Sequence, residues 1–376
     1  MRLVALIIGV ILTLATLYGL VQAMLVPRNS SNYVARLIER IVTTTSHAPL
    51  RLMRTYRRQD RWLAGSAPIT VFLQLIVYVV ILIFTIGLVM YGLGGGSYGD
   101  SLYQSGSTFT TLGLVVPANS ATIAVGFIAA FVGMVVIAVF IGYLLAIYAA
   151  FIARESTMAR VSTVTGEPAW GVQILVRAHL LGLPDANAPL SMSWVDWITS
   201  VRLSQRVNPV LSALRSTASN RHWTTTALAV LDAAALRVSF HPDERGAGHI
   251  ELLTTGAASF RVLAEVSQGR EPGSGTWDME QRLLRALEGT ESGAVDCGVT
   301  RAEFDDGLDE IQAAGVDVPA DRDAVWRRFS GIRHLYAPSL FHLAQRYHAV
   351  PAPWSGPRSP ALEVIWPERA GLQQGD

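Results

Sequence analysis

At 376 residues the chain is long enough for two or three domains, and its content of 51% hydrophobic and only 16% charged residues excludes an ordinary soluble protein. Its net charge of +1 conceals two different halves. Residues 1–153 carry nine Arg and three acidic residues, whereas the rest carries 21 Arg and 26 acidic residues.

Three long stretches contain no charged side chain, and each exceeds the roughly 20 residues that a helix needs to cross a bilayer. They are Leu3–Val26, Ile69–Leu93 and Thr122–Ile152. We therefore predict an all-α membrane protein with three transmembrane helices, the first within residues 1–27, the second at 69–93 and the third at 120–152.

The first stretch has an alternative interpretation as a signal peptide. Arg2 precedes it, and Val21-Gln22-Ala23 resembles a cleavage site with small residues. Its apolar run is longer than the 7 to 15 residues usual for a signal, and cleavage would leave the following basic segment outside the cell. These points favour a membrane span.

Residues 28–68 form a basic segment with eight arginines against only Glu39 and Asp60. The arginines are Arg28, Arg36, Arg40, Arg51, Arg54, Arg57, Arg58 and Arg61. Short loops rich in Arg remain cytoplasmic, so we expect a multi-pass protein of the cytoplasmic membrane whose N-terminus is outside and whose residues after 154 are cytoplasmic.

The basic segment also contains an amphipathic helix. Val34, Leu37, Ile38, Ile41 and Val42 recur at helical spacing, with charged residues on the opposite face. The apolar face can lie on the anionic inner leaflet or pack against the protein's own helices, and five positions do not distinguish lipid from protein.

Residues 100–117 lie between the second and third apolar stretches and are too short and too polar to cross a bilayer. A helix of about 10 residues rises only about 15 Å, half the hydrocarbon thickness. We predict a re-entrant pore helix that is capped by Asp100 and followed by irregular backbone, which survives at membrane depth only against protein or a water-filled cavity.

This order of elements resembles the pore module of the tetrameric potassium channel family, over residues 69–153. The family filter reads Thr-Val-Gly-Tyr-Gly after another Thr. Thr110 and Thr111 match the two threonines, Leu112 replaces Val, Gly113 matches the first glycine, and Leu114 replaces Tyr.

The resemblance implies that the filter binds a monovalent cation at the backbone carbonyls of Thr111, Leu112 and Gly113, with potassium as the family's ion. It also implies a homotetramer, since one segment supplies a fraction of a carbonyl cage. Tyr103 falls where the family's pore helix carries an aromatic residue that braces the filter.

The filter departs from the family at its outer end. Either Val115 occupies the place of the second glycine, or two residues are deleted before Val116. That glycine has a left-handed backbone angle, which a β-branched residue resists, and the outer acidic residue is also absent. If the filter is two residues shorter, Gly133 aligns with the glycine that is the family's gating hinge, although close helix packing is the more frequent role of a membrane glycine.

Residues 154–349 have a soluble composition and helical periodicity, so we predict a mostly helical cytoplasmic domain followed by a Pro-rich, extended or disordered tail at 350–376. No metal-ligand spacing, catalytic group or nucleotide-binding fingerprint is present, so we expect no enzyme activity and no cofactor. No basic stripe with interleaved aromatics follows residue 62, which argues against a nucleic-acid partner. A ligand of the cytoplasmic domain is left open.

The sequence thus predicts a homotetrameric cation channel with altered selectivity, in contact with the lipid bilayer and with monovalent cations. The alternative is a membrane sensor or scaffold that keeps the channel fold but does not conduct, and the altered filter supports it.

Overall fold

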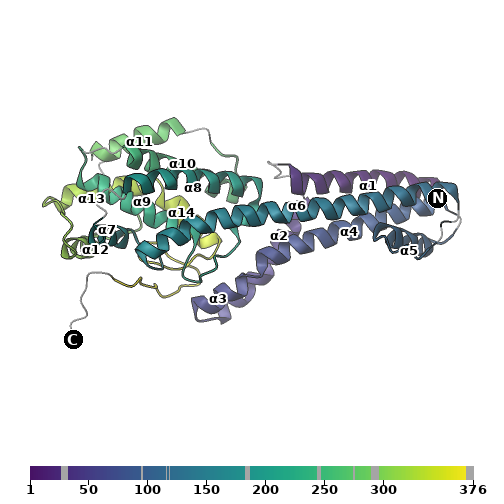
Figure 1. Ribbon diagram of the computed structural model, residues 1–376, viewed down its shortest axis with the longest axis horizontal. Coiled ribbons are helices and arrows are strands. Elements are labelled where there is room, and N and C mark those ends of the chain that lie inside the picture. Colours follow the sequence, from purple (N-terminus) through teal and green to yellow (C-terminus); the bar gives the residue numbers. More distant parts are fainter. Residues whose placement is uncertain are drawn as a thin grey trace. The chain divides into compact units, whose positions relative to one another are not determined.

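The structure is a computed structural model, and it describes residues 1–26, 33–94, 96–115, 117, 119–182, 187–243, 247–273, 276–288 and 296–369. Throughout these ranges the regular elements are helices and no strand occurs (Figure 1). The predicted all-α class is confirmed. Arg28 of the basic segment lies outside the described residues.

The chain divides into two compact units. The first comprises Met1–Ser46 and Gly65–Ala150, and the second comprises His47–Ala64 and Phe151–Asp376. The basic segment predicted as one cytoplasmic loop is therefore shared between the units, because its second half packs with the C-terminal region.

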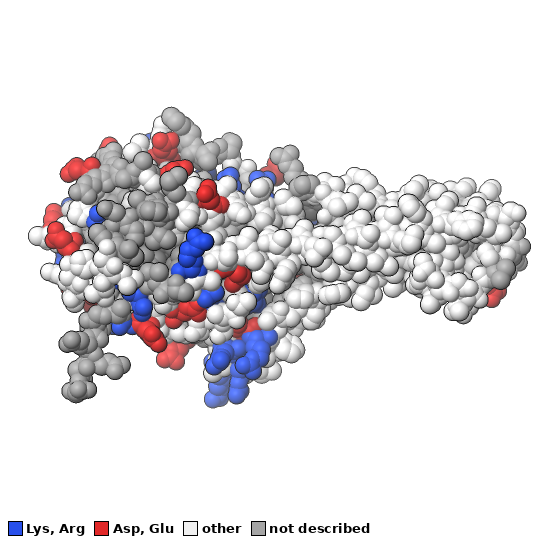
Figure 2. Space-filling view, viewed as in Figure 1, with Lys and Arg blue, Asp and Glu red and all other residues white. Residues whose placement is uncertain are grey.

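The first unit contains α1 (Arg2–Leu25), α2 (Tyr33–His47, up to Ser46), α4 (Ser66–Leu93), α5 (Tyr98–Phe109) and the first part of α6 (Ser120–Thr165). Three helical stretches of the described chain are long and apolar enough to cross a membrane: Arg2–Leu25, Tyr56–Leu93 and Ser120–Arg160. Figure 2 shows no charged side chain along most of the visible surface of these helices.

Helices α1 and α4 pack closely and run antiparallel. A Cβ at Gly9 would lie 2.8 Å from the Val89 nitrogen, and one at Gly92 would lie 2.6 Å from the Leu6 Cβ. The two glycines therefore let the backbones approach each other, as small residues do between membrane helices.

Helix α2 confirms an amphipathic helix in the basic segment. Ile38 and Val42 are buried, whereas Leu37 and Ile41 are exposed. This chain alone covers part of the predicted apolar face and leaves the rest uncovered.

Helix α6 runs beyond the predicted end of the third span. It continues from residue 152 to Thr165, and Phe151 is its first residue in the second unit. The predicted boundary followed the last apolar run, but Arg154 does not end the helix. Its guanidinium donates to the carbonyls of Leu211 and Leu214 at 2.6 and 2.7 Å, so it is satisfied inside the protein.

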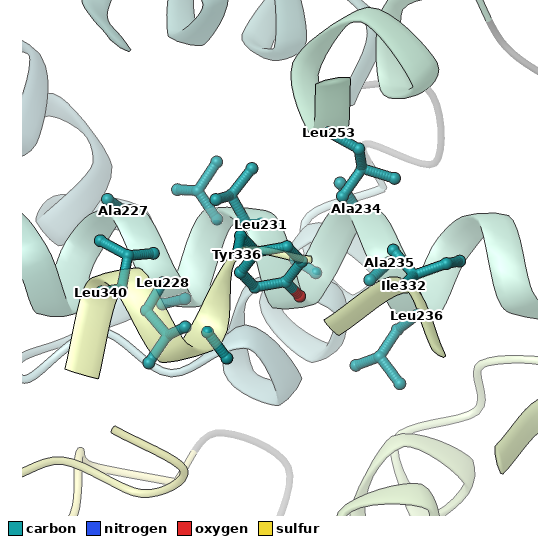
Figure 3. Packing of buried hydrophobic residues seen from close by; sticks show 14 of the residues in the cluster. Ala227, Leu228, Leu231, Ala234, Ala235, Leu236, Leu253, Ile332, Tyr336 and Leu340 are labelled. Carbon is teal, nitrogen blue, oxygen red and sulfur yellow. The ribbon is translucent and has the colours of Figure 1, made fainter. Parts of the chain in front are cut away.

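The second unit contains the other helices. They are η1 (Ala48–Leu52), α3 (Tyr56–Leu63), α7 (Gly171–Leu180), α8 (Asn187–Val207), η2 (Pro209–Ser212), α9 (Trp223–Phe240), α10 (Ala247–Ser267), α11 (Thr276–Glu288), α12 (Arg301–Ala313), α13 (Arg322–His334) and α14 (Ala337–Arg346). Helix α9 is buried almost throughout, and the side chains of α10, α13 and α14 pack around it (Figure 3).

A buried ion pair joins α9 to α13 inside this core. Arg333 donates to both carboxylate oxygens of Asp232 at 2.9 and 3.1 Å, and the Tyr336 hydroxyl donates to the same carboxylate at 2.7 Å. Arg333 also donates to the carbonyls of Cys297 and Trp354. Burial raises the pKa of Asp232, while the adjacent guanidinium opposes that rise. A buried charge that is paired in this way holds loop segments in fixed places.

The Pro-rich tail differs from the sequence-based prediction. Its first part, from Val350 to Ser355, is buried and contains a turn in which Trp354 has φ +60°. Arg358 is 6% exposed and donates to backbone carbonyls that include Ala349 and Val350. The Arg358 guanidinium supplies hydrogen bonds that composition does not reveal. Residues 370–376 lie outside the described residues.

Candidate functional site

The site is built on α5, which starts earlier than predicted. Ser97 is the N-cap, and Asp100 is the third helical residue rather than the cap. The Ser97 hydroxyl accepts from the Asp100 nitrogen at 3.2 Å, and the Asp100 carboxylate accepts from the Ser97 nitrogen at 3.1 Å. This capping box satisfies two otherwise free N–H groups. The 12 residues of α5 rise about 18 Å, too little to cross a bilayer.

Helix α5 is fixed to α4 by small and polar side chains. Ser105 is fully buried, and its hydroxyl donates to the Ile83 carbonyl at 2.8 Å. A Cβ at Gly87 would lie 3.2 Å from the Leu102 Cα, so the two backbones are close. Tyr98 donates to the Phe84 carbonyl at 3.2 Å.

Helix α6 meets the C-terminal end of α5 at Gly133. A Cβ at Gly133 would lie closer than 3.0 Å to the Phe109 carbonyl oxygen, a distance that real Cβ atoms essentially never show. One at Gly126, seven residues earlier, would lie 3.6 Å from the Thr108 Cγ2, an ordinary contact. Gly133 therefore has a packing role in this structure, and its predicted role as a gating hinge stays a prediction.

Ser107 organises the backbone that follows α5. Its carbonyl accepts from the nitrogens of Leu112 at 2.8 Å and Gly113 at 3.3 Å. Its hydroxyl accepts from the Leu114 nitrogen at 2.7 Å. Three consecutive N–H groups therefore point back at one serine.

The carbonyls of Thr111, Leu112 and Gly113 consequently point the other way. In a trans peptide the C=O is directed opposite to the N–H of the next residue, and the peptides of this segment are trans. None of these three oxygens accepts a hydrogen bond from a residue that the structure describes. The chain thus presents three adjacent carbonyl oxygens on one side, which is the donor set that a dehydrated cation needs.

The sign of the backbone angle φ alternates from Thr111 through Leu112 to Gly113. Thr111 has φ +60° and Gly113 has φ +66°. A positive φ costs a β-branched residue steric strain, so Thr111 is a conformational outlier of the kind that clusters at functional sites. Val115 is not left-handed, in contrast to the position expected for the second glycine. The chain leaves the row at Val115 with an ordinary backbone.

The side chains of this segment contribute less than its backbone. The Thr110 hydroxyl donates to the Gly106 carbonyl at 2.7 Å and so caps the end of α5. Thr111, Leu112 and Leu114 have exposed side chains. Tyr103 is 60% exposed on α5. Its predicted bracing role stays a prediction.

Sequence analysis missed Ser107. The run Ser105-Gly106-Ser107 is visible as a set of small residues that keep the helix slim, but it is also a set of hydrogen-bonding groups at the helix end. The signal that points to Ser107 is its position five to seven residues before Leu112, Gly113 and Leu114, the reach of a hydrogen bond across the end of a helix.

No group of three or more His, Cys, Asp or Glu that could hold a metal ion occurs within the described ranges. Searches against protein-family models, curated proteins and solved structures find no match to this chain.

Proposed function

We propose that this chain is the subunit of a homotetrameric cation channel of the cytoplasmic membrane. The observation that carries the proposal is the row of carbonyls at Thr111, Leu112 and Gly113, directed to one side by the three N–H bonds to Ser107. Such a row replaces water around a cation when several copies face one axis. The resemblance to the potassium channel family implies that four copies of the chain surround this axis.

The surface of α6 is consistent with assembly in a bilayer. Its exposed large apolar side chains require lipid or a neighbouring copy to cover them. They include Phe127, Ile128, Phe131, Met134, Ile137, Ile141 and Leu145. One chain encloses no pathway, so neighbouring copies cover part of this surface in the proposed assembly.

The proposed channel discriminates weakly between potassium and sodium. The row of carbonyls ends at Val115, whose backbone lacks the left-handed angle of the family's second glycine. The outer acidic residue is also missing. The inner sites near Thr111 and Gly113 remain for a cation, whereas the outer ring is lost.

The same departure favours one alternative, a non-conducting membrane sensor or scaffold that retains the pore fold. The two functions differ in ion flux. We therefore propose to measure thallium and sodium influx into vesicles that contain the purified chain, with the tetramer confirmed by its mass.

A variant of the filter sharpens this test. Gly113→Ala meets no atom within 4 Å and changes only the cost of a positive φ. Gly142→Ala, also with nothing within 4 Å, is the matched control on α6. Flux that is lost in the first and kept in the second supports the channel. A native tetramer without flux supports the scaffold.

The orientation has its own test. We expect a cysteine at Ser46 to be protected in intact cells from an impermeant thiol reagent, and one at Ser97 to react. Cys297 is buried and does not interfere. The reverse pattern would invert the topology and contradict the channel.

A further inference from the structure

Residues 47–64 precede α4 and include the first part of the candidate stretch Tyr56–Leu93, yet they belong to the second unit. Helix α3 turns one face toward that unit. Tyr56, Gln59 and Leu63 are buried at 5%, 0% and 4% exposure. This segment is therefore a docked part of a folded unit and not a free linker.

A charged and hydrogen-bonded network fixes α3 in place. The Arg215 guanidinium donates to the Asp60 carboxylate at 2.7 Å, to the Tyr56 hydroxyl at 2.9 Å and to the Tyr347 carbonyl at 2.6 Å. Asp60 is the only acidic residue of the segment 47–64. Its charge is thus already paired with Arg215.

Gln59 completes the docking. Its amide nitrogen donates to the carbonyls of Leu50 at 3.1 Å and Met53 at 2.8 Å, and its amide oxygen lies 2.5 Å from the His348 Nε2. The turn before α3 is therefore held to α3 itself and to the end of α14. The orientation of the opposite face is fixed as a consequence.

That opposite face is strongly basic. Its five arginines have exposed side chains and no acidic partner among the described residues. They are Arg51, Arg54, Arg57, Arg58 and Arg61. Figure 2 shows the resulting cluster of basic side chains over the segment labelled α3 in Figure 1. Leu52 and Trp62, at 85% and 52% exposure, add apolar surface beside it.

The chain itself keeps this face near a membrane surface. Arg61 precedes Ser66, the first residue of α4, by five residues, so the two Cα atoms are at most about 18 Å apart. Guanidinium groups form bidentate hydrogen bonds with phosphate, and tryptophan side chains favour the headgroup layer of a membrane.

We propose that the arginine face formed by α3 and the turn before it, residues 51–62, binds the headgroups of anionic phospholipids. The paired Asp60 and the docked inner face leave the positive charges without internal compensation. The proposal requires that α4 crosses a membrane and is independent of whether the pore conducts. If the arginine face instead binds an anionic partner of another class, such as RNA or an acidic protein, that partner will displace the phospholipid in the test below.

The test compares lipid retention by native mass spectrometry of the purified full chain with added phosphatidylglycerol or phosphatidylcholine. The test variant replaces the exposed arginines of α3: Arg57→Gln, Arg58→Gln and Arg61→Gln. The control variant removes the same charge from exposed arginines elsewhere in the second unit: Arg270→Gln, Arg285→Gln and Arg327→Gln.

We expect phosphatidylglycerol affinity to fall by roughly fivefold per arginine in the test variant, with phosphatidylcholine retention unchanged. The control variant should bind both lipids as the unmodified chain does. If the triple variant does not fold, Arg58→Gln alone should still show roughly a fivefold loss. Equal phosphatidylglycerol affinity in the test and control variants overturns the proposal, as does displacement of the lipid by RNA at equal phosphate concentration.

Discussion

A substitution at the contact between α6 and the end of α5 tests directly whether this packing holds the site in place. In Gly133→Ala the new Cβ would lie closer than 3.0 Å to the Phe109 carbonyl oxygen, whereas ordinary contact begins at 3.4 Å. The end of α5 must therefore retreat by at least about 0.4 Å, because a backbone carbonyl cannot rotate away as a flexible side chain can. That end carries Ser107, two residues before Phe109, and with it the orientation of the carbonyl row.

Overpacking of this kind costs about 1–3 kcal/mol. Gly→Ala in a helix also gains about 1 kcal/mol from helix propensity. Gly126→Ala receives the same gain on the same helix, but its Cβ meets only the Thr108 Cγ2 at 3.6 Å. The difference between the two variants isolates the steric cost. We expect Gly133→Ala to be less stable than Gly126→Ala by about 1–3 kcal/mol.

The assay is the loss of the folded assembly on heating in detergent, followed by its mass, together with flux measured in vesicles. We expect Gly133→Ala to lower both the transition temperature and the selectivity of any flux. Equal stability of the two variants would refute the packing argument. A normal stability and normal conductance with an altered open probability would instead favour Gly133 as a hinge.

Three further predictions follow from single hydrogen bonds and charges. Ser107→Ala removes the acceptor of the Leu114 N–H and should cost about 1 kcal/mol and reduce ion discrimination in reversal potentials, while an unchanged potential contradicts its role. Burial, with neighbouring Arg215, His47 and Arg358, lowers the pKa of His348 to about 4. The unfolded chain therefore takes up this proton first, and stability should fall between pH 6.5 and 4 by up to about 1.4 kcal/mol per pH unit. His348→Asn, which suits its φ of +50°, should reduce that dependence in denaturant titrations at each pH, and an unchanged slope contradicts the assignment. Asp232→Asn leaves a buried guanidinium unpaired and should cost about 3–5 kcal/mol, seen as faster labelling of the buried Cys297, whereas unchanged labelling contradicts it.

Local patterns in the sequence predicted local structure well. The apolar runs located the three long helices, and the helical spacing of Val34, Leu37, Ile38, Ile41 and Val42 located α2. These features depend on residues within a few positions of each other. Hydropathy and periodicity are therefore sufficient to find them.

Such local patterns did not predict the long-range contacts. Asp60 and Arg215 are 155 positions apart, and nothing in the composition of the basic segment indicates that its second half docks on the C-terminal unit. Arg358 buries a Pro-rich tail whose composition is typical of disorder. Arg215 donates to the distant carbonyls of Tyr347 and His348, whereas Arg358 donates to carbonyls close to it in the chain, and composition reveals neither set of partners.

The sequence predicted one part of the filter and not another. The resemblance identified Thr111 and Gly113, and both are left-handed in the structure. The reason for their orientation, the three N–H bonds to Ser107, is a local feature of the helix end that the family resemblance does not include. A positive φ costs a β-branched residue steric strain, yet Thr111 adopts one where the surrounding hydrogen bonds impose it.

In the proposed channel, the carbonyls of Thr111, Leu112 and Gly113 from several copies coordinate a cation. The most direct measurement is the anomalous scattering of thallium or rubidium ions in crystals of the assembled protein. We predict at least one peak on the symmetry axis, at equal distances from these carbonyls in each copy. A well-ordered tetramer in which the axis at these residues shows no ion at high thallium concentration would contradict the account.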